Sequence, residues 1–115
     1  MDSGARTPEE LEALLEDAFV LRDASALAGL LDRDAVLATT GAAVPPPGGP
    51  RRAAGAMWRR GATYVGGDVR VIRAGGLALV VADGGVLVAR RRRDGDWRLA
   101  IALLDPHTDT REEIP

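Results

Sequence analysis

The first third of the chain places apolar residues at helical spacing. They stand at Leu11, Leu14, Leu15, Ala18 and Phe19, among mostly polar neighbours. Steps of three and four residues predict a helix that buries one side. Thr7 can cap its start, and Pro8 suits its first turn. A second, shorter helix with Leu27, Leu30 and Leu31 is predicted next, followed by a polar turn at residues 32–34 and a strand at residues 35–40.

The second half of the chain favours strands. Runs rich in Val, Leu and Ala cover residues 69–73, 77–82, 86–93 and 97–104. The last three runs are separated by Asp83-Gly84-Gly85 and Asp94-Gly95-Asp96. Gly in these turns supplies the positive φ that tight hairpins require, so the strands are predicted to form an antiparallel meander.

Pro and Gly interrupt the chain between its two halves. Residues 41–50 read GAAVPPPGGP. Because Pro removes backbone donors and Gly raises the cost of ordering, we interpret this segment as a surface loop. It is either a plain connection or a lid over a pocket. Residues 51–61, with Met57 and Trp58, are predicted to form a third helix.

The size and composition of the chain fit one globular domain. It has 115 residues, of which 46% are hydrophobic and 28% charged. We expect a domain at residues 7–107, a disordered N-terminus at 1–6 and a flexible tail at 108–115. No apolar run reaches the roughly 18 residues of a membrane span, and the N-terminus lacks the apolar core of a signal peptide. A soluble, cytoplasmic protein is the expectation.

Residues that carry specialised chemistry are scarce. The chain has no Cys and a single His. This composition argues against disulfides, thiolate catalysis and a transition-metal site, and no cofactor is expected. A net charge of −2 gives no general attraction to nucleic acid or to an anionic membrane. The four arginines at 90–93 alternate between the faces of a strand and form no single basic stripe.

The order of these elements resembles the NTF2-like superfamily, in particular its SnoaL-like and ketosteroid-isomerase-like members. The stretch LRDASALAGLLDRDAVLATTG is similar to the family's second helix and first strand, and RRRRDGDWRLAIALLDP is similar to its last hairpin. The resemblance covers residues 7–106. It implies an α+β fold of the NTF2-like, or cystatin-like, kind: a cone in which three N-terminal helices pack on a curved antiparallel sheet around an apolar pocket.

The ketosteroid isomerases of this superfamily need a carboxylate base and a donor for the developing enolate. When residues 15–41 are laid against their opening segment, the base falls on Thr39 and the helix-one tyrosine on Leu15. Neither side chain can perform those roles, so isomerisation by that mechanism is not expected. Relatives also carry an acid in a terminal Asp-Asn-Pro run, whereas this chain has Leu104-Asp105-Pro106. The acid is displaced by one position, which reverses its face on a strand.

Asp105 is the preferred catalytic acid or base. Strict alternation puts it at the end of an apolar row formed by Trp97, Leu99, Ile101 and Leu103. If that row faces the pocket, burial suits Asp105 to acid–base work; otherwise it caps the turn before Pro106. Asp83 is the second candidate acid, with a turn role as its alternative. His107 either pairs with Asp105 or belongs to a solvated tail.

Larger side chains are expected to bind an apolar ligand, with plain core as their alternative. They are Leu15, Phe19, Thr39, Met57, Trp58, Tyr64, Leu99, Ile101 and Leu103. Both faces of the later strands are apolar, which predicts a homodimer through the free sheet face. Two functions stay open. One is an acid–base cyclase, isomerase or hydratase acting on a small oxygenated hydrophobic metabolite; the other is a noncatalytic ligand-binding or homodimerisation module.

Overall fold

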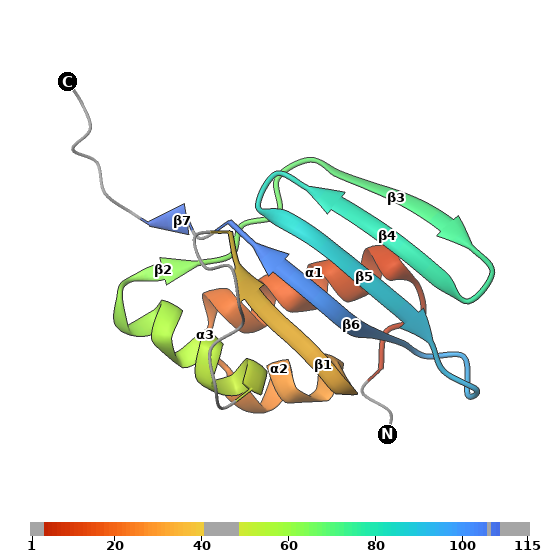
Figure 1. The fold of residues 1–115 in the computed structure, drawn as a ribbon, viewed down its shortest axis with the longest axis horizontal. Coiled ribbons are helices and arrows are strands. Elements are labelled where there is room, and N and C mark those ends of the chain that lie inside the picture. Colours follow the sequence, from red (N-terminus) through yellow and green to blue (C-terminus); the bar gives the residue numbers. More distant parts are fainter. Residues whose placement is uncertain (1–3, 41–48, 106, 109–115) are drawn as a thin grey trace.

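The computed structural model describes residues 4–40, 49–105 and 107–108 and has the expected α+β architecture (Figure 1). Its helices are α1 (Pro8–Val20), α2 (Ala24–Leu30) and α3 (Gly49–Arg59). The main sheet contains β1 (Leu31–Thr39), β3 (Val69–Ala74), β4 (Leu77–Ala82), β5 (Gly85–Arg91) and β6 (Trp97–Leu104). A two-stranded sheet pairs β2 (Ala62–Thr63) with β7 (His107–Thr108). Figure 1 shows α1 and α2 behind the main sheet and α3 beside β1.

Side-chain caps fix the starts of the first two helices. The Thr7 hydroxyl accepts a hydrogen bond from the Glu10 amide at 3.0 Å, and the Glu10 carboxylate accepts one from the Arg6 amide at 2.7 Å. The predicted cap at Thr7 is therefore confirmed. At α2, the Asp23 carboxylate accepts a hydrogen bond from the Ala26 amide at 3.0 Å. These bonds satisfy amides that have no partner within the helix.

The C-terminal strands form the predicted antiparallel meander, in the order β3, β4, β5, β6. β1 lies on the other side of β6 and runs parallel to it. β1 starts at Leu31, so the predicted polar turn at residues 32–34 is wrong. That segment belongs to the strand, because a register shift between Leu31 and Val36 accommodates the extra residues against β6.

β6 contains an extra residue, Ala100. Leu99 pairs with Ala89 and Ile101 pairs with Val88, so no residue of β5 is the partner of Ala100. Leu99 and Ala100 are both buried, and alternation resumes with Ile101 exposed on the opposite face. This is a β-bulge, and it reverses the faces of all later residues in the strand.

The bulge divides the apolar row that strict alternation predicts. Trp97 and Leu99 are buried against the helices, whereas Ile101 and Leu103 lie on the other face of the sheet. Asp105, two residues after Leu103, is also exposed. The prediction of one continuous row from Trp97 to Asp105 is wrong because it assumed a strand without a bulge.

The hydrophobic core lies between the helices and the inner face of the main sheet. Its largest fully buried side chains are Tyr64, Phe19, Leu11, Leu15, Leu27, Leu37, Met57, Leu87, Leu99, Leu104 and Val80. Burial of each large apolar side chain stabilises the fold by about 1.5–3 kcal/mol relative to exposure. Side chains from both layers thus occupy the interior of the cone.

The predicted N-terminus, loop and C-terminal tail lie at the ends of the described ranges. The Trp97 amide donates to the carbonyl of Ala5 at 2.8 Å and Ala5 is fully buried, so the packed domain begins before Thr7. Both ends of the chain, residues 1–3 and 109–115, lie outside the described residues, and so do residues 41–48 of the predicted loop. The last two residues of that predicted loop, Gly49 and Pro50, belong to α3. Within the described ranges, no helix has the length and apolar character needed to cross a membrane.

Asparagine substitutions after the bulge test which face each residue occupies. Ala102 is 1% exposed, so Ala102→Asn buries an amide in the core and should destabilise the protein by about 2 kcal/mol or more. Ile101→Asn puts the same amide on the outer face of the sheet and should cost less than Ala102→Asn. Urea unfolding followed by circular dichroism measures both losses. A larger loss for Ile101→Asn would mean that the strand has no bulge.

Candidate functional site

Glu12 is the one buried charged side chain among the residues that the structure describes. It is 6% exposed and lies in α1, one turn after the capped start of the helix. Its Oε2 atom accepts a hydrogen bond from the Tyr64 hydroxyl at 2.5 Å. Tyr64 directly follows β2 and is fully buried. The pair joins the first helix to the segment that leads into β3.

Two glycines allow this segment to approach the carboxylate closely. A Cβ atom at Gly66 would collide with Glu12 Oε2, and one at Gly84 would lie 3.1 Å from Tyr64 Cε1 and collide with the carbonyl of Val65. Neither position therefore tolerates a larger residue without movement of the backbone or of the pair. The chain between β2 and β3 packs directly on α1 and on the β4–β5 turn.

Burial favours the neutral forms of both side chains. Desolvation raises the pKa of Glu12 above its ordinary value, and the nearby charge of Glu16 acts in the same direction, although the Tyr64 hydrogen bond opposes them. Burial is also the main reason that the pKa of Tyr64 is raised, and Glu12 adds to the effect. Tyr64 consequently stays a hydrogen-bond donor to Glu12.

Aromatic rings surround this pair. Phe19 makes edge-to-face contacts with Trp58 and Tyr64, at centroid distances of 5.7 Å and 6.3 Å. The Trp58 indole nitrogen and the Thr63 hydroxyl are buried and have no hydrogen-bond partner among the residues that the structure describes. An unpaired buried donor costs free energy, so these two groups are available to an oxygen atom that could reach them.

The structure separates the predicted ligand-binding residues into two groups. Those in or packed against the core are Leu15, Phe19, Met57, Trp58, Tyr64 and Leu99. Thr39 is half-buried at the end of β1, whereas Ile101 and Leu103 lie on the outer face of the sheet. The six core residues therefore belong to one cluster, and Ile101 and Leu103 face away from it.

The two predicted acids lie at the ends of strands and face solvent. Asp105 is exposed, and its carboxylate accepts a hydrogen bond from the Thr40 hydroxyl at 3.1 Å. Asp83 is exposed in the β4–β5 turn, where its carboxylate accepts a hydrogen bond from the Asp68 amide at 3.1 Å. Among the described residues, neither acid shares a hydrogen-bond partner with Glu12. The side chain of His107 lies outside the described part of the chain.

Glu12 was missed in the sequence because helix-one polar residues were treated as the solvated side. A signal was present, since Glu12 stands four residues after Pro8 and three before Leu15. Both neighbours are buried, and the same stripe continues to Phe19. A carboxylate on the apolar stripe of an amphipathic helix could have been singled out by this spacing alone.

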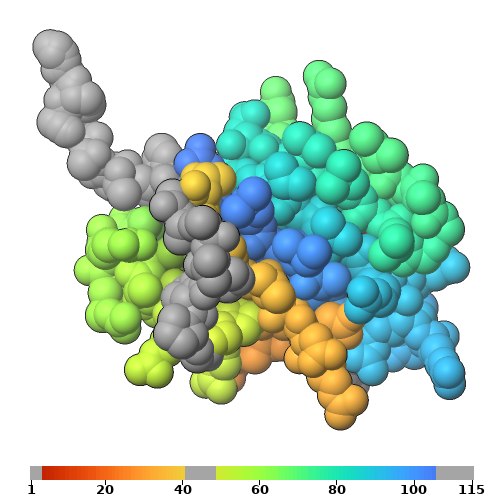
Figure 2. Space-filling model, viewed as in Figure 1, coloured from red at the N-terminus to blue at the C-terminus, as the bar shows by residue number. Residues whose placement is uncertain are grey.

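The outer face of the main sheet is apolar and is covered by none of the described helices. Its exposed large residues are Val36, Ile72, Leu77, Leu79, Val81, Val86, Ile101 and Leu103, and each is 37–61% exposed. Strand register places them on one face, since Val36 pairs with Ile101, Val81 with Val86 and Ile72 with Leu79. We call these residues the open face. Figure 2 shows this side of the sheet, over β1 and β3 to β6.

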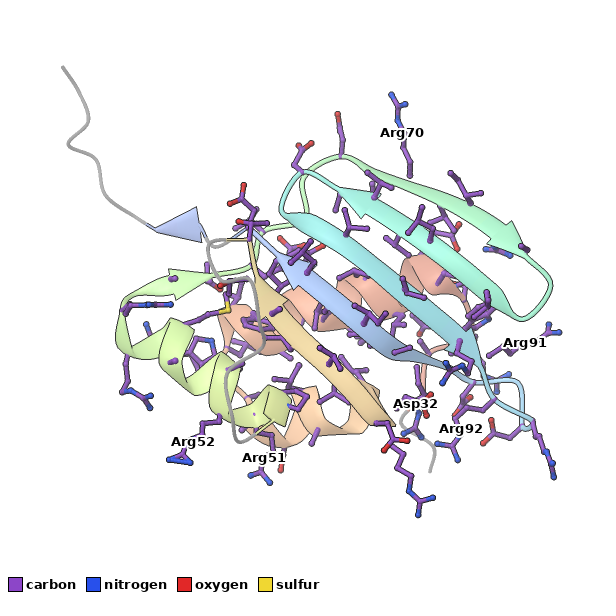
Figure 3. All side chains as sticks on the ribbon, in the orientation of Figure 1. Asp32, Arg51, Arg52, Arg70, Arg91 and Arg92 are labelled. Carbon is purple, nitrogen blue, oxygen red and sulfur yellow. The ribbon has the colours of Figure 1, made fainter. Side chains whose placement is uncertain are left out.

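Charged residues border the open face at both ends of β6. Arg90 and Arg98 are directly paired across β5 and β6 at one end, and Arg90 binds the Asp32 carboxylate at 2.6 Å. Burial disfavours ionised Asp32, but hydrogen bonds from the Arg33 amide and Arg90 outweigh it and hold the pKa of Asp32 below its ordinary value. Figure 3 shows Asp32 at this end of the sheet and Arg70 at the opposite end.

Two surface hollows lie outside the cone. One is formed by Leu14, Asp17, Ala18, Leu21, Asp23, Ala26 and Leu30 between α1 and α2, and the other by Ile72, Ala74, Leu77, Ala78, Leu79 and Val88 on the open face. Neither includes Glu12 or Tyr64. Among the described residues, no group of three metal-ligating side chains comes together.

Comparison with known proteins identifies the fold. No family model matches the chain, and no curated protein matches it. A cystatin-like protein of unknown function from Nostoc punctiforme is similar in structure, with a TM-score of 0.64, 16% identity and coverage of 90% of each chain. An NTF2-like protein from Novosphingobium aromaticivorans has a TM-score of 0.60 at 20% identity, with 89% of this chain and 80% of that chain covered.

A candidate ketosteroid isomerase from Parabacteroides distasonis is also similar, with a TM-score of 0.59, 14% identity and coverage of 89% of each chain. At these identities the likeness concerns the fold. The chain has the NTF2-like, cystatin-like fold that the order of its elements predicts.

Glu12 should make stability depend on pH. Because folding raises its pKa, the stabilisation that it contributes is full below its ordinary value of 4.5 and is lost as pH rises through the raised pKa. Glu12→Gln keeps a hydrogen-bond acceptor for Tyr64 and cannot ionise, so this loss should disappear. Urea unfolding at a series of pH values measures this dependence of the free energy of unfolding on pH.

Asp34→Asn is the matched control, because Asp34 is exposed in β1. It should keep the wild-type pH profile. If Glu12→Gln also keeps the wild-type profile, the pKa of Glu12 in the folded protein is not raised above its ordinary value of 4.5.

Proposed function

We propose that this protein is a noncatalytic module with the NTF2-like fold that assembles as a homodimer through the open face of its sheet. The observation that supports this most strongly is the exposure of a continuous set of large aliphatic side chains. Ile72, Leu77 and Ile101 are 61%, 47% and 48% exposed, in a chain whose inner sheet face contributes buried side chains to the core. The proposal includes a cytoplasmic location, which a chain without Cys fits.

The dimensions of the open face suit a second copy. Five strands about 4.8 Å apart and six residues of about 3.4 Å each give a patch of roughly 24 by 20 Å. Apolar patches of this size are at the upper end of those on monomeric proteins. Two such faces can pack as in a β-sandwich, with side chains interdigitating between the sheets. A two-fold axis would satisfy both copies with one surface.

The burial of large side chains between the helices and the sheet supports a noncatalytic role. Leu15, Phe19 and Met57 are at most 1% exposed and occupy the inside of the cone. Asp105 and Asp83 are exposed at the ends of strands, and each carboxylate accepts a local hydrogen bond. A small-molecule enzyme needs a concave apolar site that joins its acid or base to bound substrate.

Glu12 and Tyr64 support a second candidate function. A buried carboxyl beside a phenol is a combination that acid–base enzymes use. In this alternative, a cyclase, isomerase or hydratase binds a small oxygenated hydrophobic ligand near Glu12 rather than at Asp105. Saturable thermal stabilisation by apolar ketones, lost in Tyr64→Phe, would favour this candidate over the module. The absence of any saturable shift is the result expected for the module.

A charge placed in the open face should abolish the dimer. Leu79 is 38% exposed near the centre of this face, and Leu79→Arg would bring two cations together at the two-fold interface. Sedimentation equilibrium at micromolar concentration should give a dimer for the wild type and a monomer for Leu79→Arg, at least a tenfold weakening of association.

Leu21→Arg is the matched control. Leu21 is 73% exposed after α1, on the helical side of the molecule, and its replacement should leave the dimer intact. A wild-type protein that stays monomeric at these concentrations would overturn the proposal.

A further inference from the structure

The open face carries opposite charges at the two ends of β6. Arg98 lies in the second position of the strand, between the buried Trp97 and Leu99, and therefore points to the outer side. After the bulge, Ile101 and Leu103 lie on that same side, and so does Asp105. The apolar centre of β6 thus has a cation at one end and an anion at the other.

The cation at Arg98 is not balanced within the described part of the chain. Arg90 is its direct neighbour on β5, and the Asp32 carboxylate is bound to Arg90 at 2.6 Å. Arg98 makes no ion pair with any described residue, and its Nε atom is buried without a hydrogen-bond partner. A buried N–H without an acceptor costs free energy, and the charge of the guanidinium is left without a counter-ion among the described residues.

The anion at Asp105 is also unbalanced. Its described side-chain partner is the neutral Thr40 hydroxyl, at 3.1 Å. Strand register aligns Arg70 of β3, through β4 and β5, with Leu103, two residues before Asp105. β3 is three strands from β6 in the sheet order, which is about 14 Å. Arg70 is therefore too distant to neutralise Asp105.

Two-fold symmetry offers two ways to stack this face on itself. An axis parallel to the strands superposes the same ends of β6, so that Arg98 approaches Arg98 and Asp105 approaches Asp105. An axis across the strands reverses the partner, so that each cationic end meets an anionic end. Like charges at an interface cost several kcal/mol, whereas opposite charges fix the orientation of the partner.

We infer that two copies of this chain pack with their β6 strands antiparallel across the interface, each Asp105 facing the Arg98 of the partner. This inference rests on the proposed homodimer and adds its orientation. The two side chains are separated by roughly 20 Å along β6, since one of the intervening residues is the bulge. The symmetry forms the ion pair twice, once at each end of the apolar patch, and gives the charge of each Arg98 a carboxylate as its counter-ion.

The cysteine-free sequence permits a direct test by cross-linking. Arg98→Cys and Asp105→Cys are prepared separately, checked for the wild-type circular dichroism spectrum, and treated with a short bis-maleimide alone and as an equimolar mixture. The mixture should give covalent dimers, because position 98 of one copy faces position 105 of the other. Each variant alone should give less than about a tenth of that yield.

The outcomes separate this inference from the homodimer itself. If the wild type is a dimer and each variant cross-links alone, the axis runs along the strands and the inferred orientation is wrong. If the wild type sediments as a monomer, the proposed homodimer itself is wrong, and the inferred orientation is wrong with it. Covalent dimers in the mixture alone support both.

Charge reversal gives an independent measurement. Asp105→Arg should weaken the dimer about tenfold, because two cations then meet at each end of the interface, and Arg98→Asp should weaken it similarly. Combining the two changes should restore affinity to within about threefold of the wild type. Reversal at Glu16, on α1, is the control and should have no effect. A double variant no stronger than the single ones would overturn the pairing.

Discussion

The extra residue at Ala100 determines which side chains of β6 belong to the core and which belong to the surface. Because a strand alternates with a period of two, one additional residue exchanges the faces of everything after it. Trp97 and Leu99 pack against the helices, and Ala102 and Leu104 return to them after the bulge. Ile101 and Leu103 are left outside, and with them the chain acquires an outer surface as aliphatic as its interior. The exposure of these aliphatic side chains and the outward position of Asp105 have the same cause.

The interior contains a polar interaction that the fold does not need for packing. An aliphatic residue at position 12 would fit the stripe of α1 that also holds Leu15 and Phe19. The chain instead buries the Glu12 carboxyl group, which accepts a hydrogen bond from the Tyr64 hydroxyl. Two residues without a Cβ atom, Gly66 and Gly84, allow the backbone to approach this pair closely. A hydrogen bond between such groups has strict geometry, whereas aliphatic contacts tolerate sliding. The Glu12–Tyr64 bond therefore selects one position of the first helix relative to the β2–β3 segment.

The sequence predicted the fold well, because most of its elements depend on local rules. The cap at Thr7, the stripe that ends at Phe19 and the Asp94-Gly95-Asp96 turn each specify a structure within a few residues. The main errors involved interactions between distant segments. A bulge depends on how β6 pairs with both neighbours, and the placement of residues 32–34 depends on the parallel contact of β1 with β6. Strict alternation predicts an inward-facing Asp105, and the one extra residue of β6 reverses it. Glu12 acquires its hydrogen-bond partner from a residue in another part of the chain.

The position of β6 in the sheet has a consequence for how the chain reaches its native state. β6 is the last strand of the main sheet in sequence, yet it lies between β1 and β5. The contact between Thr40 and Asp105 joins residues 65 positions apart. Until β6 is synthesised, the helices and the β3–β5 meander can form, but β1 has no strand to pair with and the inner edge of β5 stays open. Closure of the sheet is thus a late, nonlocal step, of the kind that slows folding and exposes strand edges to aggregation during synthesis.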